Sequence, residues 1–383
     1  MRRVYFGTDN IITSLGFSTK ENAGNIINGI SGIKVFEDKS LSPSPVAYSA
    51  VDNTRLEMRF QESLKKSSLI KSEIGFTRLE KIIFISIFGA LKNSGVSPSD
   101  PRTVMVFSTT KGNIDWLEDN TRVYLWEMAE YMAKLSNCYN VPVVISNACS
   151  SGSVAIMQAA RLIASGKYDH AIVTGGDIIS EFVIAGFQSF QALSNEACKP
   201  FDANRIGLSL GEGCGTVVMT SDPAKAYGGK QVCYLGGGTS NDANHISGPS
   251  RDGEGLYLAI TAAMKEADIV PAELDFISAH GTATPYNDEM ESLALNWAGL
   301  EKVPVNSFKG YIGHTLGAAG VIETILSIYS MRNNILLKSF GYQYNGVSRP
   351  LNVITQNIHQ PVKKVLKTAS GFGGCNAGLV IGY

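Results

Sequence analysis

Short apolar runs rich in β-branched residues recur along the whole chain and are its strongest structural signal. In chain order they cover residues 104–107, 141–146, 170–174, 215–220, 275–279, 303–306, 365–369 and 379–381. Between them lie longer apolar stretches with helical spacing, such as residues 154–165. Strands that alternate with helices predict an α/β fold built in layers.

The chain also resembles itself. A turn of small residues leads into an apolar helix at residues 149–163, and the same pattern returns at residues 316–331. Such self-similarity predicts an internal duplication. Proline, glycine and lysine cluster between Asp222 and Lys230. We therefore expect one half to cover residues 1–225 and the other residues 226–383.

Composition narrows the class of protein. A formal net charge of −1 over 383 residues gives no reason to expect nucleic acid or an anionic membrane as a partner. The longest apolar run, residues 82–91, is too short to cross a bilayer and predicts a buried helix. Met1–Arg3 could begin a signal peptide, but Asp9 and Asn10 interrupt the apolar stretch that follows. The six cysteines show no CxxC pairing, which favours reduced thiols and a cytoplasmic protein.

The candidate chemistry centres on Cys149, within the sequence Asn-Ala-Cys-Ser-Ser-Gly. Cys149 lies between the strand predicted at residues 141–146 and the helix predicted at residues 154–165. A lone cysteine is usually a small buried side chain. At the start of a helix, however, backbone N–H groups favour a negative sulfur, so we expect an electropositive, partly exposed thiol.

Two histidines and a lysine in glycine-rich segments accompany this cysteine. His280 follows a predicted strand in the sequence Ala-His-Gly-Thr-Ala-Thr-Pro, and Lys309 stands five residues before His314 in Lys-Gly-Tyr-Ile-Gly-His. Glycine lets the backbone approach a ligand closely. A nucleophilic cysteine with two imidazoles and a lysine is a set suited to carbon–carbon bond formation through a thioester.

These segments, and the closing Gly-Phe-Gly-Gly-Cys-Asn at residues 371–376, resemble the elongating β-ketoacyl-acyl carrier protein synthases of the thiolase-like superfamily. The resemblance runs nearly the whole chain. It implies a five-layered α-β-α-β-α fold made of two similar halves. It also implies a 3-oxoacyl-[acyl-carrier-protein] synthase that works in fatty-acid or related polyketide or polyene synthesis. The resemblance further implies that the enzyme binds acyl carrier protein loaded with an acyl or a malonyl group. It implies a homodimer and no cofactor.

The resemblance assigns the roles in the reaction. Cys149 would accept the acyl chain as a thioester, and the N–H groups of Cys149 and Phe372 would bind the oxyanion. His280 and His314 would donate to the enolate oxygen formed when malonyl thioester loses CO₂. Lys309 would order the histidines, and Glu323 would contact this lysine.

Three further assignments concern the surroundings of the site. Asp288 and Glu291, one helical turn apart, are supporting residues or simply solvated carboxylates. Phe372 matches a gating residue in a glycine loop, although Ala369 and Ser370 replace the usual Ser-Phe pair. Phe372 is one candidate for the acyl pocket, and Thr110, which falls near the position that sets pocket depth in the family, is the other. His170, His245 and His359 show no ligand spacing, so no metal is expected.

Residues 111–140 depart from the family pattern because the segment is short and rich in Tyr and Trp. Two interpretations stay open: a repacked dimer interface, or an acyl pocket altered for extended unsaturated or aryl-ended chains. Two other functions compete with the condensing enzyme. A non-decarboxylating thiolase needs a second cysteine as base, for which Cys375 is the candidate. A silent partner subunit that shapes chain length would lack a nucleophile such as Cys149.

Overall fold

A ten-stranded sheet dominates the computed structural model, which describes residues 2–66, 75–118, 122–227, 231–242 and 248–383. His245, Lys230 and residues 119–121 of the short segment lie outside the described residues. The strand order is β11-β10-β14-β15-β9-β1-β8-β6-β4-β5. The strands of the first half are β1 (Val4–Ile12), β4 (Thr103–Ser108), β5 (Val143–Ile145), β6 (His170–Asp177) and β8 (Gly213–Thr220). Those of the second half are β9 (Cys233–Asn241), β10 (Phe276–Ser278), β11 (Val305–Asn306), β14 (Lys364–Gly371) and β15 (Cys375–Gly382).

The two halves of the sheet have the same topology. Numbered within its own half, each set of five strands has the order third, second, fourth, fifth, first. In both, the third, second and fourth strands are parallel, and the fifth strand is antiparallel to its two neighbours. β1 and β9 join the halves through two residue pairs. The expected division after residue 225 falls in the connection between β8 and β9 and stays a prediction.

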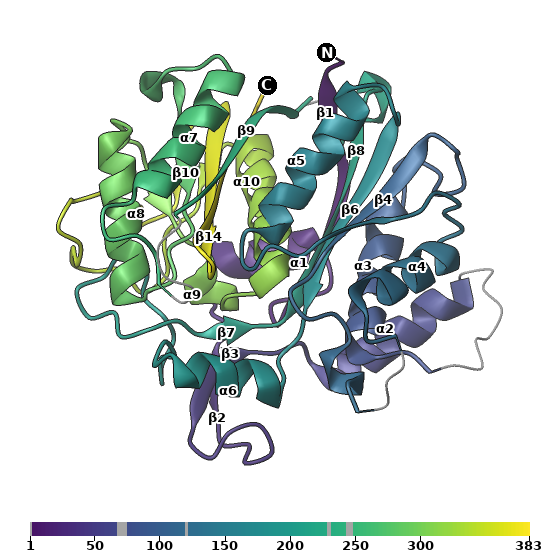
Figure 1. Cartoon of the computed structure of the whole chain (residues 1–383), viewed down its shortest axis with the longest axis horizontal. Helices are drawn as coiled ribbons and strands as arrows, with labels where there is room; N and C mark the ends of the chain where they lie inside the picture. The colour runs from purple at the N-terminus through teal and green to yellow at the C-terminus, as the bar shows by residue number, and fades with distance from the viewer. Residues whose placement is uncertain (1, 67–74, 119–121, 228–230, 243–247) are drawn as a thin grey trace.

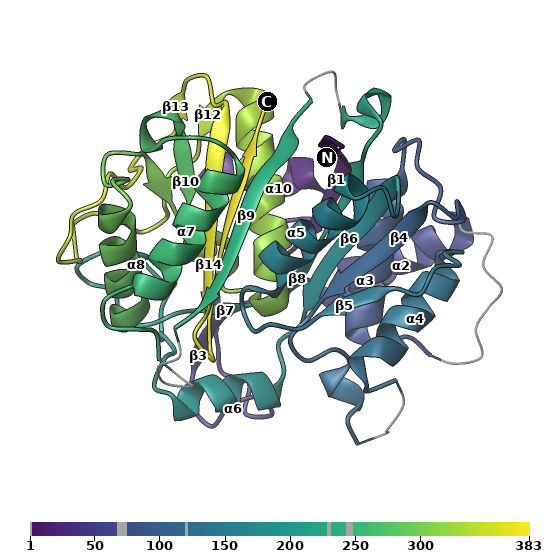
Figure 2. The ribbon, with the colours of Figure 1, turned by 45° about the horizontal axis from the view of Figure 1, so that its top comes forward.

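Helices cover both outer faces and fill the space between the two half-sheets (Figures 1 and 2). In the middle, α5 (Ser151–Ala164) and α10 (Ala319–Asn333) pack against each other and against strands of both halves. On the outside lie α3 (Arg78–Leu91) in the first half and α7 (Glu254–Glu266) in the second. Further helices are α1 (Thr19–Ile27), α2 (Asn53–Lys66), α4 (Leu125–Leu135), α6 (Glu181–Ser189), α8 (Pro285–Trp297) and α9 (Lys309–Ile312). The layers therefore alternate α-β-α-β-α, as expected.

Two glycines let the central helices touch. A Cβ on Gly152 would lie 2.7 Å from the backbone nitrogen of Val321, and one on Gly320 would lie 2.2 Å from that of Ser153. Both contacts are with backbone, which cannot move aside cheaply. The start of α5, which directly follows Cys149, is thereby held against the start of α10.

A small cap lies below the main sheet (Figure 1). It contains α6 and a three-stranded sheet of β2 (Lys34–Phe36), β3 (Val46–Ser49) and β7 (Leu210–Gly211). A two-stranded pair, β12 (Ile335–Leu336) and β13 (Ile358–His359), lies in the second half. In the part of the chain that the structure describes, every helix is too short or too polar to span a membrane.

Candidate active site

Cys149 lies on a strained turn between β5 and α5. Ala148 before it has φ of 45°, a left-handed conformation that costs free energy for a residue other than glycine. The Ser151 hydroxyl supports this turn, since it donates to the Ala148 carbonyl at 2.5 Å and accepts from the backbone N–H of Asn147 at 2.7 Å. The sulfur is thus fixed at the N-terminal end of α5, as the sequence predicts.

The expectation of a partly exposed thiol is wrong, although two lysines do act on the sulfur. Cys149 is only 8% exposed. Burial raises the pKa of its thiol to about 12, and Cys375 acts in the same direction, while Lys309 and Lys111 lower it. Removing water from around a thiolate costs more free energy than the attraction of the two ammonium groups provides. Cys149 is therefore a protonated thiol at neutral pH in this structure.

A cavity of about 230 Å³ is lined in part by Cys149. It brings together residues from both halves: Cys149 from the first half, and His280, His314 and Phe372 from the second. Its other walls are mostly apolar and include Phe187, Phe190, Ile206, Leu208, Pro249, Pro285 and Tyr286. A largely apolar cavity with a few converging polar groups is the usual form of a small-molecule site.

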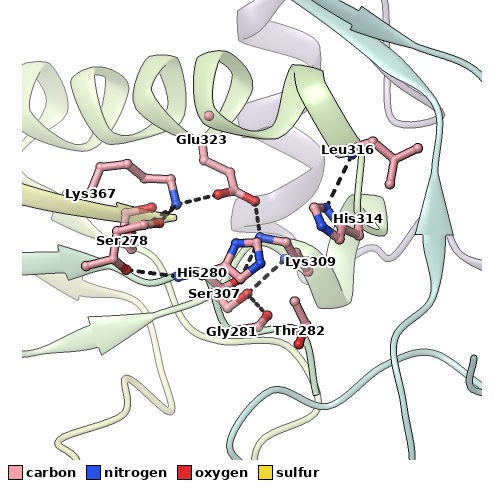
Figure 3. A network of polar contacts seen from close by, with 12 residues as sticks. Ser278, His280, Gly281, Thr282, Ser307, Lys309, His314, Leu316, Glu323 and Lys367 are labelled. Atoms are coloured by element: carbon pink, nitrogen blue, oxygen red, sulfur yellow. Dashed lines mark hydrogen bonds and ion pairs between the residues drawn. The ribbon is translucent and has the colours of Figure 1, made fainter. Parts of the chain in front are cut away.

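The two imidazoles face each other in this cavity. Their ring centroids are 5.2 Å apart, and the rings are nearly perpendicular. Burial lowers the pKa of both His280 and His314 well below the ordinary value, and the charge of Lys309 lowers it further. The Leu316 N–H donates to Nδ1 of His314 at 3.3 Å (Figure 3). Nε2 of neutral His314 therefore carries the hydrogen, and this buried atom has no partner within the described residues.

Behind the imidazoles lies a buried charge network (Figure 3). Lys309 donates to the His280 carbonyl at 2.5 Å and to Oε1 of Glu323 at 2.7 Å. Oε2 of Glu323 forms an ion pair with Lys367 at 2.6 Å. The structure thus brings Lys309 and Glu323 together as the resemblance implies. It adds Lys367, whose position inside an apolar strand was the one signal in the sequence that could have revealed it.

The supporting carboxylates Asp288 and Glu291 are fully buried rather than solvated. Glu291 accepts the backbone N–H of His280 at 2.9 Å and that of Gly281 at 2.8 Å. Asp288 accepts the N–H groups of the next two residues, Thr282 and Ala283. Burial raises the pKa of Asp288 to about 6. Both side chains hold the His280 loop through its backbone.

Phe372 covers one side of the cavity. Its ring packs on Phe187 and Phe190, with centroid distances of 5.4 and 5.0 Å. The loop is tied to the nucleophile turn by Cys375, whose thiol donates to the carbonyls of Asn147 at 3.4 Å and Phe372 at 3.5 Å. From the sequence Cys375 was only a candidate base, and this link is evident in the structure alone.

The structure does not place Thr110 on the cavity. Its hydroxyl donates to Asp177 at 3.0 Å, and its backbone N–H donates to the same carboxylate. Asp177 also accepts from Thr109 and from the backbone N–H of Gly317. Of the two acyl-pocket candidates, only Phe372 lines this cavity. Thr110 instead belongs to a clamp that joins the ends of β4 and β6 to the turn after His314.

A repeated five-stranded half-sheet, with a cysteine at the start of the central helix, defines the thiolase-like fold. Sequence models for the N-terminal and C-terminal domains of beta-ketoacyl synthase match residues 10–224 and 232–343. The chain belongs to the β-ketoacyl synthase family. This membership indicates an enzyme of the acyltransferase type.

Known proteins agree with this assignment. A 3-oxoacyl-[acyl-carrier-protein] synthase 2 from Rhizobium meliloti is 36% identical over 251 residues, which cover 62% of this chain and 59% of that protein. One from Coxiella burnetii is 27% identical over 99% of this chain and 98% of its own length. The structure of the ketosynthase ApeO with its chain length factor ApeC, from Xenorhabdus doucetiae, aligns with a TM-score of 0.86 and 26% identity over 100% of this chain and 98% of that one.

Proposed function

We propose that this protein is a 3-oxoacyl-[acyl-carrier-protein] synthase that uses Cys149 as its nucleophile. The observation that carries the proposal is that one cavity holds Cys149 together with His280 and His314, both uncharged. A thiol can hold an acyl chain as a thioester. Two neutral imidazoles can donate hydrogen bonds to an oxygen on which negative charge develops.

In the first half-reaction the Cys149 sulfur attacks the carbonyl carbon of an acyl thioester on acyl carrier protein. The backbone N–H groups of Cys149 and Phe372 are the candidates to bind the oxyanion. The carrier thiolate then leaves, and the acyl chain stays on Cys149. Because the pKa of the Cys149 thiol is raised to about 12, its proton must depart during this step, and it ends on the leaving carrier thiolate.

In the second half-reaction malonyl-acyl carrier protein loses CO₂. The electron pair of the broken carbon–carbon bond moves into the thioester, and the negative charge collects on its oxygen. The N–H group on Nε2 of His314, and its counterpart on His280, would stabilise that enolate. The enolate carbon then attacks the thioester carbon on Cys149, and the Cys149 thiolate leaves to release β-ketoacyl-acyl carrier protein.

Separate assays of the two half-reactions test the proposal. Cys149→Ala should still release CO₂ from malonyl-acyl carrier protein while forming no acyl-enzyme. His280→Ala and His314→Ala should still load an acyl chain on Cys149, as read by intact-protein mass spectrometry. Loss of one good donor from such a site costs about 3–4 kcal/mol, so CO₂ release should fall by about 10²–10³. Wild-type CO₂ release from both histidine variants would disprove the mechanism.

A thiolase reaction is supported less well. It needs a base, and the Cys375 thiol instead donates to two backbone carbonyls. A silent partner subunit is also disfavoured, because Cys149 occupies the nucleophile position. Condensation of two acyl thioesters without any malonyl thioester, at a rate comparable with the decarboxylative reaction, would reverse this ranking.

We also propose that the enzyme acts as a dimer that docks acyl carrier protein, with the thiols reduced as in the cytoplasm. The support for a dimer is the end strand β5 and the exposed apolar side chains beside it. Tyr139 is 81% exposed and Val141 77%. A sheet edge of this kind invites pairing with another chain. The partner is a second copy of the chain or, as the ApeO structure suggests, a chain length factor.

The walls of the cavity bear on which acyl chain the enzyme accepts. The apolar walls of the cavity and the rings of Phe187, Phe190 and Phe372 suit extended unsaturated or aryl-ended chains. Turnover of saturated and polyunsaturated acyl-acyl carrier proteins of equal length should favour the unsaturated series or treat the two alike. A clear preference for saturated chains would indicate ordinary fatty-acid elongation.

A further inference from the structure

Lys367 is a buried positive charge that the reaction scheme does not use. It lies in β14 between Leu366 and Thr368, and its side chain is fully buried. Its ammonium pairs with Glu323 at 2.6 Å and donates to the carbonyls of Thr368 and Ser278, the latter at 3.4 Å. Burying an ammonium costs several kcal/mol unless it is well paired. A strand interior without a catalytic neighbour would favour an apolar residue here.

One carboxylate serves two lysines in this network (Figure 3). Oε1 of Glu323 pairs with Lys309 and Oε2 with Lys367. Glu323 could be neutralised by Lys309 alone. With Lys367 included, the side chains of Lys309, Glu323 and Lys367 carry a net charge of +1. This charge lies behind the imidazoles of His280 and His314. This excess charge is what Lys367 contributes.

Building on the proposed function, we propose that Lys367 is a positioning residue for decarboxylation. It fixes the Glu323 carboxylate from the side opposite Lys309, and its charge keeps His280 and His314 as neutral hydrogen-bond donors. The ammonium acts through these neighbours and does not touch the substrate.

The electrostatics of the imidazoles agree with this role. After burial, Lys309 and Lys367 both lower the pKa of His280 and of His314, and His314 also lowers the pKa of His280. Protonation of His314 at Nδ1 would abolish the hydrogen bond that this atom accepts from Leu316. The ring would then lose the contact that aims Nε2 into the cavity.

Other charged groups around Lys367 come from three helices. Glu323 lies on α10, Lys309 on α9 and Glu291 on α8. Burial lowers the pKa of Lys367, Glu323 and Glu291 raise it, and Lys309 lowers it. Glu291 accepts hydrogen bonds from the backbone N–H of His280 and, at 2.6 Å, from the Thr368 hydroxyl. Glu323 is therefore the group that couples Lys367 to the site.

The test is the pH profile of CO₂ release from malonyl-acyl carrier protein between pH 5 and pH 9. Lys367→Met removes one positive charge, so the imidazoles should protonate more readily. The acid limb, the low-pH side of the profile on which the rate falls, should therefore move to higher pH. Because Lys367 is one of the charges that lower the pKa of both imidazoles, the ratio of the rates at pH 5 and pH 8 should be lower in Lys367→Met than in wild-type protein. Lys364→Met on the same strand, whose ammonium pairs with Glu273 at the surface, is the matched control.

A charge rescue separates electrostatics from packing. Glu323→Gln alone should move the acid limb to lower pH. The double variant Lys367→Met, Glu323→Gln restores the net charge of one positive, so its acid limb should return toward that of wild type. Acyl loading of Cys149 reports that each variant is folded. If Lys367→Met does not fold, Lys367→Gln and Glu323→Gln must still show the opposite shifts.

Two failures can be told apart. Wild-type protein that releases no CO₂ from malonyl-acyl carrier protein would overturn the proposed function itself. Wild-type protein that is active, with an acid limb unchanged in Lys367→Met and Lys367→Gln, would overturn only the role of Lys367. A double variant with an acid limb at higher pH than in Lys367→Met would likewise reduce Lys367 to a packing residue.

Discussion

Gly371 lies against the backbone of Cys149. A Cβ on residue 371 would come within 2.8 Å of the Cys149 nitrogen and 2.9 Å of the Cys375 sulfur. Gly371 ends β14 and leads into the Phe372 loop, so this contact sets the spacing between the two N–H groups proposed for the oxyanion. The absence of a side chain at residue 371 is therefore a requirement of the site.

Gly371→Ala should damage acyl loading. The added methyl group must push the Cys149 turn away from the Phe372 loop, because backbone atoms cannot yield as a flexible side chain can. Loss of one oxyanion donor typically lowers the rate by about 10²–10³, which sets the expected fall in acyl-enzyme formation. Stopped samples analysed by mass spectrometry measure it. Gly24→Ala, where a Cβ meets no atom within 4 Å, is the control, and equal loading by both variants would refute the argument.

Alkylation of Cys149 should depend steeply on pH. Its thiol pKa is raised to about 12, so the thiolate fraction grows about tenfold for each pH unit between pH 7 and pH 9. Iodoacetamide labelling, followed by peptide mass spectrometry, should show this slope. Cys149 should also react before the other five cysteines, because it lines the cavity and they do not. A labelling rate independent of pH above pH 7 would mean that the thiolate already exists.

Asp177→Asn should destabilise the fold. The carboxylate accepts hydrogen bonds from Thr109, Thr110 and Gly317, and an amide offers one oxygen in place of two. Leaving a buried donor unpaired costs about 1–3 kcal/mol, so the thermal unfolding midpoint should fall. Asp38→Asn, at an exposed carboxylate that accepts only from the neighbouring Ser40, should lower the midpoint less. An unchanged midpoint in Asp177→Asn would show that the clamp is energetically unimportant.

The proposed dimer makes a prediction about mass. Sedimentation at micromolar concentration should give a species of twice the 41.1 kDa of one chain. Val141→Asp and Tyr139→Asp place charges beside β5, where they would be buried by a partner, and should shift the protein toward the monomer. Tyr344→Asp, at another exposed aromatic residue, is the control. A wild-type protein that sediments as a monomer would contradict the proposal.

The order of strands and helices could be predicted because it depends on local patterns. The β-branched apolar runs correspond to β4, β6 and β8 in the structure. The turns of small residues lie at the starts of α5 and α10. The positions of Cys149, His280, Lys309 and His314 could be predicted because their neighbours repeat family motifs.

What only the tertiary structure decided is the environment of these residues. The sequence places Cys149 at a helix start, which favours a thiolate, but the packing of both halves around it removes water and raises the pKa of the thiol. Lys367 appears in the sequence only as a charge inside an apolar strand. Its role depends on Glu323, which lies more than forty residues earlier in the chain. Burial and charge pairing arise between distant segments, so local pattern cannot determine them.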